Sequence, residues 1–271
     1  VIFLALEVVP GDPAAYMLGI NAQEDTLAAL RAELGLDQSR VERYFSWVGG
    51  MVQGDFGTSY TYRTPVAEMI GDRLWVSLPL AVYAVGFIPA VWTFYLGIID
   101  QLGADPMRVL EQTLGLWALR FLIITLAITP LRDLFGYNFV RYRRAFGLLC
   151  FYYTLLHLTT YVVLDQNLNI AVILNDVFKR PFITAGVLSF VVLTLLAITS
   201  NNMMIHRMGA ASWIKLHRFV YLAAAAAAVH FILLVKSWPM EPLVYFAIVM
   251  TLLACRLFKR IRKRRRKLVA I

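Results

Sequence analysis

The chain has 271 residues, of which 60% are apolar and only 16% are charged, and its mean hydropathy is +0.66. This composition excludes an ordinary soluble domain and predicts a helical membrane protein with several spans. The net charge of +9 is unevenly distributed, because residues 1–75 hold 5 Lys/Arg and 10 Asp/Glu whereas residues 76–271 hold 21 and 7. The basic surplus fits cytoplasmic loops and membrane lipid rather than nucleic acid. We therefore predict two segments, residues 1–75 and 76–271, with different origins or locations.

Residues 1–75 predict short helices and loops. Residues 1–9 are apolar but too short to cross a bilayer, and the chain begins without Met, as expected of a truncated sequence. Residues 23–48 predict amphipathic helices, the first beginning at Asp25 or Thr26 and ending at Gly35. Residues 49–64 predict a loop, and residues 66–74 predict a short helix. This segment contains no catalytic constellation in its sequence.

Three stretches of the N-terminal segment match a known pattern: PGDPAAYMLG, ERYFSWVGGMVQGDFGTSYTYRTPV and RLWVSLPLA. They resemble the N-terminal part of the inner-membrane permeases for dipeptides and oligopeptides, over about residues 1–82. The cytoplasmic loop by which such permeases dock on their ATPase has no counterpart downstream. We interpret the segment as a fusion or mis-join onto a complete second module. A peptide-transport permease subunit is the alternative function.

From residue 76 onward the sequence predicts six apolar spans, near residues 76–99, 114–131, 145–164, 182–200, 213–235 and 242–258. Basic residues lie between spans two and three, between four and five, and after span six, where the run KRIRKRRRK predicts a lipid-surface anchor. The positive-inside rule places these loops and both ends of the module in the cytoplasm. In the permeases the stretch like residues 10–75 is periplasmic, and we favour the charge pattern over that placement.

Three histidines lie in predicted spans, where an imidazole is costly and usually has a function. His157 lies 13 residues past Arg144, and His230 lies 15 residues past Lys215. Both are thus about 20 Å into the membrane, on helices of the same direction. Two imidazoles from facing helices are the usual axial ligands of a low-spin heme. The alternative is two buried polar residues that satisfy other groups.

His217 lies near the cytoplasmic boundary, 13 residues before His230, which corresponds to about 20 Å and about 140° on an ideal helix. A bulge or local twist would bring the two rings closer to the same face of the helix. Residues 223–228 between them are all alanine, which we expect to leave room for a flat, bulky group. His217 is a candidate ligand of a second heme, although the third span offers no matching histidine. An interfacial histidine is the alternative, and His206, in a polar loop, is expected to face solvent.

Polar residues beside the third span are further candidates. Arg141, Arg143 and Arg144 form a cluster suited to heme propionates, a flavin phosphate or a quinone carbonyl. The alternative is that these arginines only determine topology. Thr160, one turn beyond His157, is expected to hydrogen-bond a propionate or the ring's partner. The predicted metal ligands are His157, His230 and His217, and the further predicted cofactor contacts are Arg143, Arg144 and Thr160. No nucleotide-binding loop is present in the sequence, so the reductant is expected to come from a quinone or a separate flavin reductase.

Long stretches of the second module also match a known pattern: residues 102–134, 141–165, 179–200 and 213–237, which include RYRRAFGLLCFYYTLLHLTTYVVLD and WIKLHRFVYLAAAAAAVHFILLVKS. They resemble the MsrQ (YedZ) family, the heme-binding membrane subunit of the bacterial methionine sulfoxide reductase system. This family is a relative of the ferric reductase membrane domains. The resemblance implies an all-α fold: a six-helix transmembrane bundle of ferric-reductase-like type, preceded here by a small helical segment.

The same resemblance implies b-type heme, one or two per chain, and reported FMN binding. It implies electron transfer from a quinone or a cytoplasmic flavin reductase to a periplasmic, molybdenum-containing methionine sulfoxide reductase subunit. The chain is then an electron-transfer subunit of an oxidoreductase system rather than a catalytic subunit on its own. The expected location is the bacterial inner membrane, with the C-terminus in the cytoplasm.

Overall fold

The computed structural model describes residues 12–19, 22–33, 35–59, 62, 64–234 and 239–269, so the apolar residues 1–9 lie outside the described part. Within the described residues the chain is helical, and an isolated bridge between Thr58 and Pro65 is the one strand-like pairing. The predicted all-α fold is confirmed. The chain divides into two compact units, residues 1–78 and 79–271.

The N-terminal unit contains α2 (Pro13–Leu18), α3 (Glu24–Glu33) and α4 (Arg40–Val52). Asp12 caps α2 by accepting a 3.0 Å hydrogen bond from the N–H of Ala14, and it also accepts a 2.8 Å bond from Arg31 of α3. The Arg31 guanidinium lowers the pKa of Asp12, which keeps this link ionised at neutral pH. Ser39 and Glu42 form a capping box at the start of α4. The two helices predicted over residues 23–48 are present as α3 and α4, and the capping box explains where α4 begins.

Helix α5 (Val66–Ile98) differs from the prediction, because the expected short helix at 66–74 is only its beginning. No strong breaker separates residue 74 from the apolar stretch that follows, and the helix runs on through Pro79 and Pro89. The hydroxyl of Thr93 donates a 2.7 Å hydrogen bond to the Pro89 carbonyl. Proline lacks the N–H that would bond the carbonyl four residues earlier, so this bond adds to the local hydrogen bonding of the helix without replacing the missing one. The preceding loop also starts later than predicted, since α4 extends to Val52.

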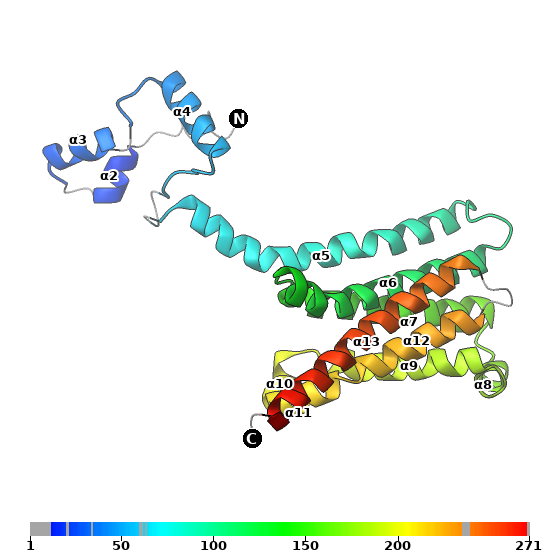
Figure 1. Ribbon diagram of the computed structural model, residues 1–271. Coiled ribbons are helices and arrows are strands. Elements are labelled where there is room, and N and C mark those ends of the chain that lie inside the picture. Colours follow the sequence, from blue (N-terminus) through cyan, green and yellow to red (C-terminus); the bar gives the residue numbers. More distant parts are fainter. Residues whose placement is uncertain are drawn as a thin grey trace. The chain divides into compact units, whose positions relative to one another are not determined.

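The six predicted spans are confirmed: among the described residues, six segments are long and apolar enough to cross a membrane, and Figure 1 shows the helices that contain them. They are Ser77–Ile98 within α5, Pro106–Phe135 (α6), Val140–Asp165, Pro181–Ile198 (α9), Ala210–Leu234 and Met240–Lys259 within α13 (Met240–Val269). The third span comprises η1 (Val140–Tyr142), α7 (Arg143–Thr159) and the π-helix η2 (Thr160–Asp165), and the fifth comprises α11 (Ala210–His217) and α12 (Val220–Leu234). The chain is a multi-pass membrane protein.

Two features of the spans were not predicted. The fifth span is interrupted at residues 218–219, so His217 and His230 lie on separate helices rather than on one. The 13-residue spacing suggested a bulge or local twist within one helix, and the chain instead breaks between two helices. The third span changes to π-helix at Thr160, three residues after His157. Single π-turns inside α-helices frequently occur at functional sites.

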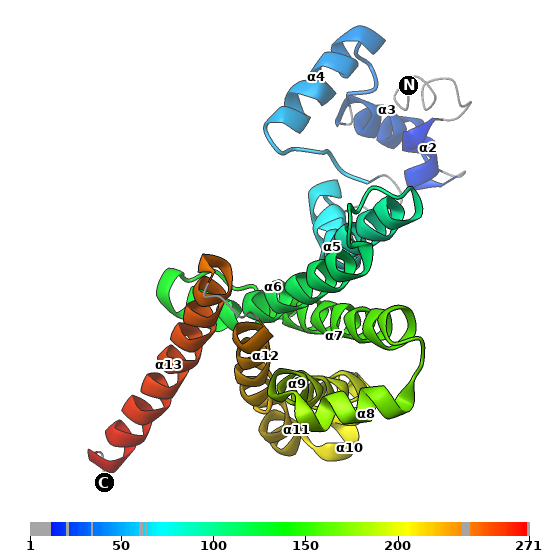
Figure 2. The ribbon, with the colours of Figure 1, turned by 90° about the vertical axis from the view of Figure 1, so that its right-hand side faces the viewer.

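Two short helices were also not predicted, α8 (Ile170–Lys179) and α10 (Asn202–Met208). Helix α8 lies across the direction of the spans, since it is seen end-on in Figure 1 and lengthwise in Figure 2. Its Asp176 is buried, accepts a 2.9 Å hydrogen bond from the Tyr161 hydroxyl and pairs with Arg180 at 3.0 Å. These contacts connect the end of the third span to the start of the fourth.

Two helix pairs form the centre of the bundle. Helix α6 packs along α7, and α9 packs along α12; α7 also contacts α9, and α12 contacts α6 and α13. Tyr153 of α7 is fully buried, and its hydroxyl donates to the Gly86 carbonyl at 2.7 Å and accepts from the N–H of Ala90 at 3.0 Å. This hydroxyl thus stands between a carbonyl and an N–H that would ordinarily bond each other along α5.

The alanine run on α12 serves close helix packing. Ala223, Ala224, Ala226 and Ala228 are buried, and the Ala223 carbonyl accepts a 3.0 Å hydrogen bond from Ser189 of α9. The prediction that this run leaves open room is wrong for these four residues, because neighbouring protein atoms cover them. Small side chains let two helix backbones approach closely, which is a common basis of helix packing in membranes.

Candidate functional site

His157 of α7 and His230 of α12 lie next to each other, as their equal depth predicted. Their ring centroids are 6.1 Å apart and their planes are inclined by 75°. Metal–imidazole bonds of about 2 Å on opposite sides of one ion would place the two centroids about 6 Å apart. The pair therefore has the spacing of two axial ligands of a single metal.

Backbone carbonyls hold both rings in place. The Nδ1 atom of His157 lies 2.9 Å from the Glu111 carbonyl of α6, and Nδ1 of His230 lies 2.7 Å from the Phe182 carbonyl of α9. A carbonyl only accepts, so Nδ1 of each ring must carry the proton and donate. Among the described residues, no hydrogen bond engages Nε2 of either ring. Each histidine therefore offers Nε2 as a ligand atom, with its tautomer set by the backbone.

Two glycines face these rings, and the sequence reasoning missed both. A Cβ atom built on Gly115 of α6 would lie 3.2 Å from Nδ1 of His157. One built on Gly186 of α9 would lie 2.8 Å from Nδ1 of His230. Each glycine stands out in the sequence because it interrupts an apolar span. The sequence around it does not show that a histidine of another helix faces it.

His217 has a different environment at the other end of the bundle. Its ring stacks on Trp213 with a centroid distance of 3.8 Å, and its Nε2 lies 3.2 Å from the hydroxyl of Thr199. Trp213 in turn donates a 2.8 Å hydrogen bond to the Thr199 carbonyl. No second histidine ring contacts His217 in the part of the chain that the structure describes. His206 is exposed on α10, as predicted.

The predicted arginines lie away from the histidine pair, whereas Thr160 follows His157 by three residues. Arg143, the first residue of α7, donates to the Thr129 hydroxyl of α6, and exposed Arg144 donates a 3.1 Å hydrogen bond to Asn202 of α10. Both arginines lie at the opposite end of α7 from His157. Thr160 is only 2% exposed, and its hydroxyl donates to the Leu156 carbonyl at 3.0 Å. The buried Nε of Arg143 has no partner among the described residues.

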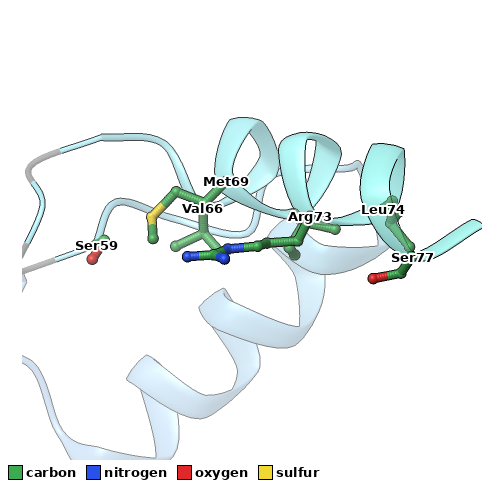
Figure 3. A pocket seen from close by; sticks show the side chains of 7 residues that line it. Ser59, Val66, Met69, Arg73, Leu74 and Ser77 are labelled. Carbon is green, nitrogen blue, oxygen red and sulfur yellow. The ribbon is translucent and has the colours of Figure 1, made fainter. Parts of the chain in front are cut away.

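A hollow lies in the N-terminal unit, lined by Ser59 and by one side of the first turns of α5, including Met69, Arg73 and Ser77 (Figure 3). It contains no histidine, cysteine or carboxylate in its lining. The described residues also contain no group of three or more metal-ligating side chains. The histidine pair is therefore the strongest candidate for chemistry in the described part of the chain.

Comparison with known proteins agrees with this geometry. Residues 114–228 match the family model of the ferric reductase like transmembrane component, a range that contains His157 and ends two residues before His230. The chain is 60% identical over 177 residues to the protein-methionine-sulfoxide reductase heme-binding subunit MsrQ of Brucella anthropi, covering 65% of this chain and 80% of that protein. It is 57% identical over 185 residues to MsrQ of Brucella ovis, covering 68% and 81%. The chain belongs to the MsrQ family.

Two further comparisons concern the N-terminal segment and the solved structures. Residues 1–81 match the model of the N-terminal part of binding-protein-dependent transport system membrane components. This is the segment whose wording resembles the peptide permeases, and it ends within the first span. No solved structure matches the chain. The ferric-reductase match lies within the six-span part, which carries every histidine of the chain.

Proposed function

We propose that this chain transfers electrons across a membrane through a b-type heme held between His157 and His230. One observation carries the proposal: two imidazoles from separate helix pairs lie 6.1 Å apart, each fixed through Nδ1 by a carbonyl of the adjacent helix. Curated relatives at 57–60% identity are named heme-binding subunits of a methionine-sulfoxide reductase. A bound heme would supply a carrier that gains and loses one electron without breaking bonds.

The residues of the chain hold and orient that group. His157 and His230 would hold the heme iron through Nε2, and the Glu111 and Phe182 carbonyls fix their tautomers. Thr160, buried one turn beyond His157, is a proposed cofactor contact. Because both histidines would bind the iron, no coordination position would be left for a substrate, and the bound heme would serve electron transfer.

We further propose the direction of electron flow. The basic loops and the basic end of the C-terminal helix face the cytoplasm of a bacterial inner membrane, by the positive-inside rule. Electrons enter there from a quinone or a flavin reductase and leave from the heme to a periplasmic, molybdenum-containing methionine sulfoxide reductase subunit. His217, Arg143 and Arg144 lie at the basic end. They are the proposed contacts for a second heme, a flavin such as FMN or a quinone on the entry side.

Spectroscopy of the purified chain tests the proposal. We expect a reduced-minus-oxidised spectrum of low-spin b-type heme, and extraction of the heme should give one or two per chain. A protein that is folded, inserted in the membrane and free of heme would contradict the proposal. Heme of high-spin character with an open coordination position would contradict the two-histidine ligation.

The topology has its own test. An epitope placed after Ile271 should survive protease added outside intact spheroplasts, because the tail is expected in the cytoplasm. A control epitope in the loop between α5 and α6, at residues 99–105, should be removed. Reversed protection of the two epitopes would invert the proposed direction of electron flow.

The second candidate function is that of a peptide-transport permease subunit. It is favoured by the match of residues 1–81 to the transport-system model and by nothing in the six-span part. Stable association with a transport ATPase, together with the absence of heme, would support it against the electron-transfer proposal.

A further inference from the structure

The two histidines are held by the same local arrangement, repeated on two different helices. On α6 the accepting carbonyl belongs to Glu111, and the glycine facing the ring is Gly115. On α9 the carbonyl belongs to Phe182, and the glycine is Gly186. In both helices the glycine comes four residues after the carbonyl. Two independent sites thus share one spacing.

Helix geometry explains this spacing. The carbonyl of residue i points along the helix toward residue i+4, and the Cβ of residue i+4 tilts back toward it. An imidazole that donates to carbonyl i from the side must therefore occupy the space of the Cβ at i+4. The distances agree, since a Cβ at residue 186 would lie 2.8 Å from Nδ1 and 3.1 Å from Cε1 of His230. At residue 115 the corresponding distances to His157 are 3.2 and 3.3 Å.

We propose that Gly115 and Gly186 are positioning residues that set the mutual angle of the two imidazole planes. The inference rests on the proposed binding of heme between His157 and His230. The Nδ1–H bond lies in the plane of its ring, so the direction of each carbonyl fixes the rotation of the ring that donates to it. Two carbonyls on two helices then fix the planes at the observed 75°. A Cβ at residue 186 would displace the ring of His230 from its carbonyl, and a Cβ at residue 115 would require the ring of His157 to shift by a few tenths of an ångström.

The angle between ligand planes has a spectroscopic signature that is independent of activity. In oxidised low-spin hemes, nearly perpendicular imidazole planes give a strongly anisotropic electron paramagnetic resonance (EPR) signal with a large maximal g value. Nearly parallel planes give a rhombic signal with a smaller one. The wild-type protein is therefore expected to show the strongly anisotropic signal.

The experiment compares Gly115→Ala and Gly186→Ala with Gly147→Ala in the full-length, heme-loaded protein. Gly147 lies inside α7, and a Cβ there would meet only the Thr125 methyl at 3.9 Å, an ordinary contact. It therefore controls for the general effect of replacing a glycine in a span. We expect Gly186→Ala to lower the maximal g value most and to reduce heme per protein severalfold. Gly115→Ala should change both in the same direction but less, and Gly147→Ala should change neither.

Each outcome decides the proposal. A wild-type EPR spectrum with full heme in both Gly115→Ala and Gly186→Ala would overturn it, and so would a rhombic wild-type signal. A variant that loses heme while keeping wild-type helical circular dichroism and membrane insertion supports it. A variant that loses heme together with its helical signal counts against it, because the glycine is then needed for the fold and not for the ring. If the wild-type protein binds no heme, the proposed function fails instead, which is a different result.

Discussion

The histidines at the two ends of the bundle have different hydrogen-bond partners. At the end where α6 and α9 begin, His157 and His230 bind carbonyls through Nδ1 and keep Nε2 available. At the other end, the Nε2 of His217 faces the Thr199 hydroxyl at 3.2 Å, and its ring is covered by Trp213. All three imidazoles are partly buried in apolar spans, so burial alone does not distinguish them. What distinguishes them is the ring nitrogen that the protein itself occupies, and only the first pair is prepared for two-sided ligation.

From this comparison of the two bundle ends, we expect the largest effect on heme binding from mutations of the paired histidines. His157→Ala and His230→Ala should each abolish the main low-spin heme signal, because removing one ligand leaves the iron with a single protein bond. Reduced-minus-oxidised spectra of the purified variants measure this loss. His206→Ala, which changes an exposed histidine on α10, is the matched control and should keep the full signal. Full-intensity spectra in both ligand variants would refute the pairing.

A smaller, kinetic effect is expected at His217. His217→Ala should leave the heme between His157 and His230 bound but slow its reduction from the donor side. The reason is distance: residue 217 lies 13 residues before His230, so the donor end of the span is on the order of 20 Å from the heme. Stopped-flow reduction by the physiological donor measures the rate, and reduction by dithionite, which bypasses the donor, should remain normal. A wild-type donor rate would remove His217 from the path.

The rigidity of the paired site can be weakened without touching a ligand. Tyr153 lies one turn before His157 on α7 and is joined to α5 by two buried hydrogen bonds. Tyr153→Phe should lower the free energy of unfolding by about 1–3 kcal/mol, because the Ala90 N–H and the Gly86 carbonyl lose their partner. Unfolding in detergent, followed by circular dichroism, measures the change. Tyr152→Phe, at an exposed tyrosine of the same helix, should leave the free energy of unfolding almost unchanged. An equal loss of stability in both variants would argue against a special contribution of the Tyr153 hydroxyl.

The smallest effect is expected from the N-terminal unit. Deleting residues 1–75 should leave membrane insertion and heme content unchanged, because every histidine and every residue that holds one lies beyond residue 110. Heme per protein and membrane fractionation of the truncated chain provide the measurement. If the truncated chain neither inserts nor binds heme, the two segments are not independent. The N-terminal unit would then be needed to form the histidine pair.

The sequence alone determined the six spans, the helical fold and the equal depth of His157 and His230. These follow from local properties: apolar length decides whether a segment can cross a bilayer, and a constant rise per residue converts spacing into depth. The family resemblance was also carried by the sequence. The break at residues 218–219, the extension of α5 and the cross-lying α8 did not follow, because turns and continuous helices are compatible with the same local composition.

Only the tertiary structure decided how the histidines are held. Which carbonyl meets a ring depends on the rotation of two helices about their own axes and on their vertical offset, and hydropathy records neither. Gly115 and Gly186 are indistinguishable from other span glycines until α7 and α12 are packed against α6 and α9. The same packing buries alanines of the 223–228 run that composition alone assigned to an open space. Distances of a few ångströms between helices thus separate a ligand pair from two buried polar residues.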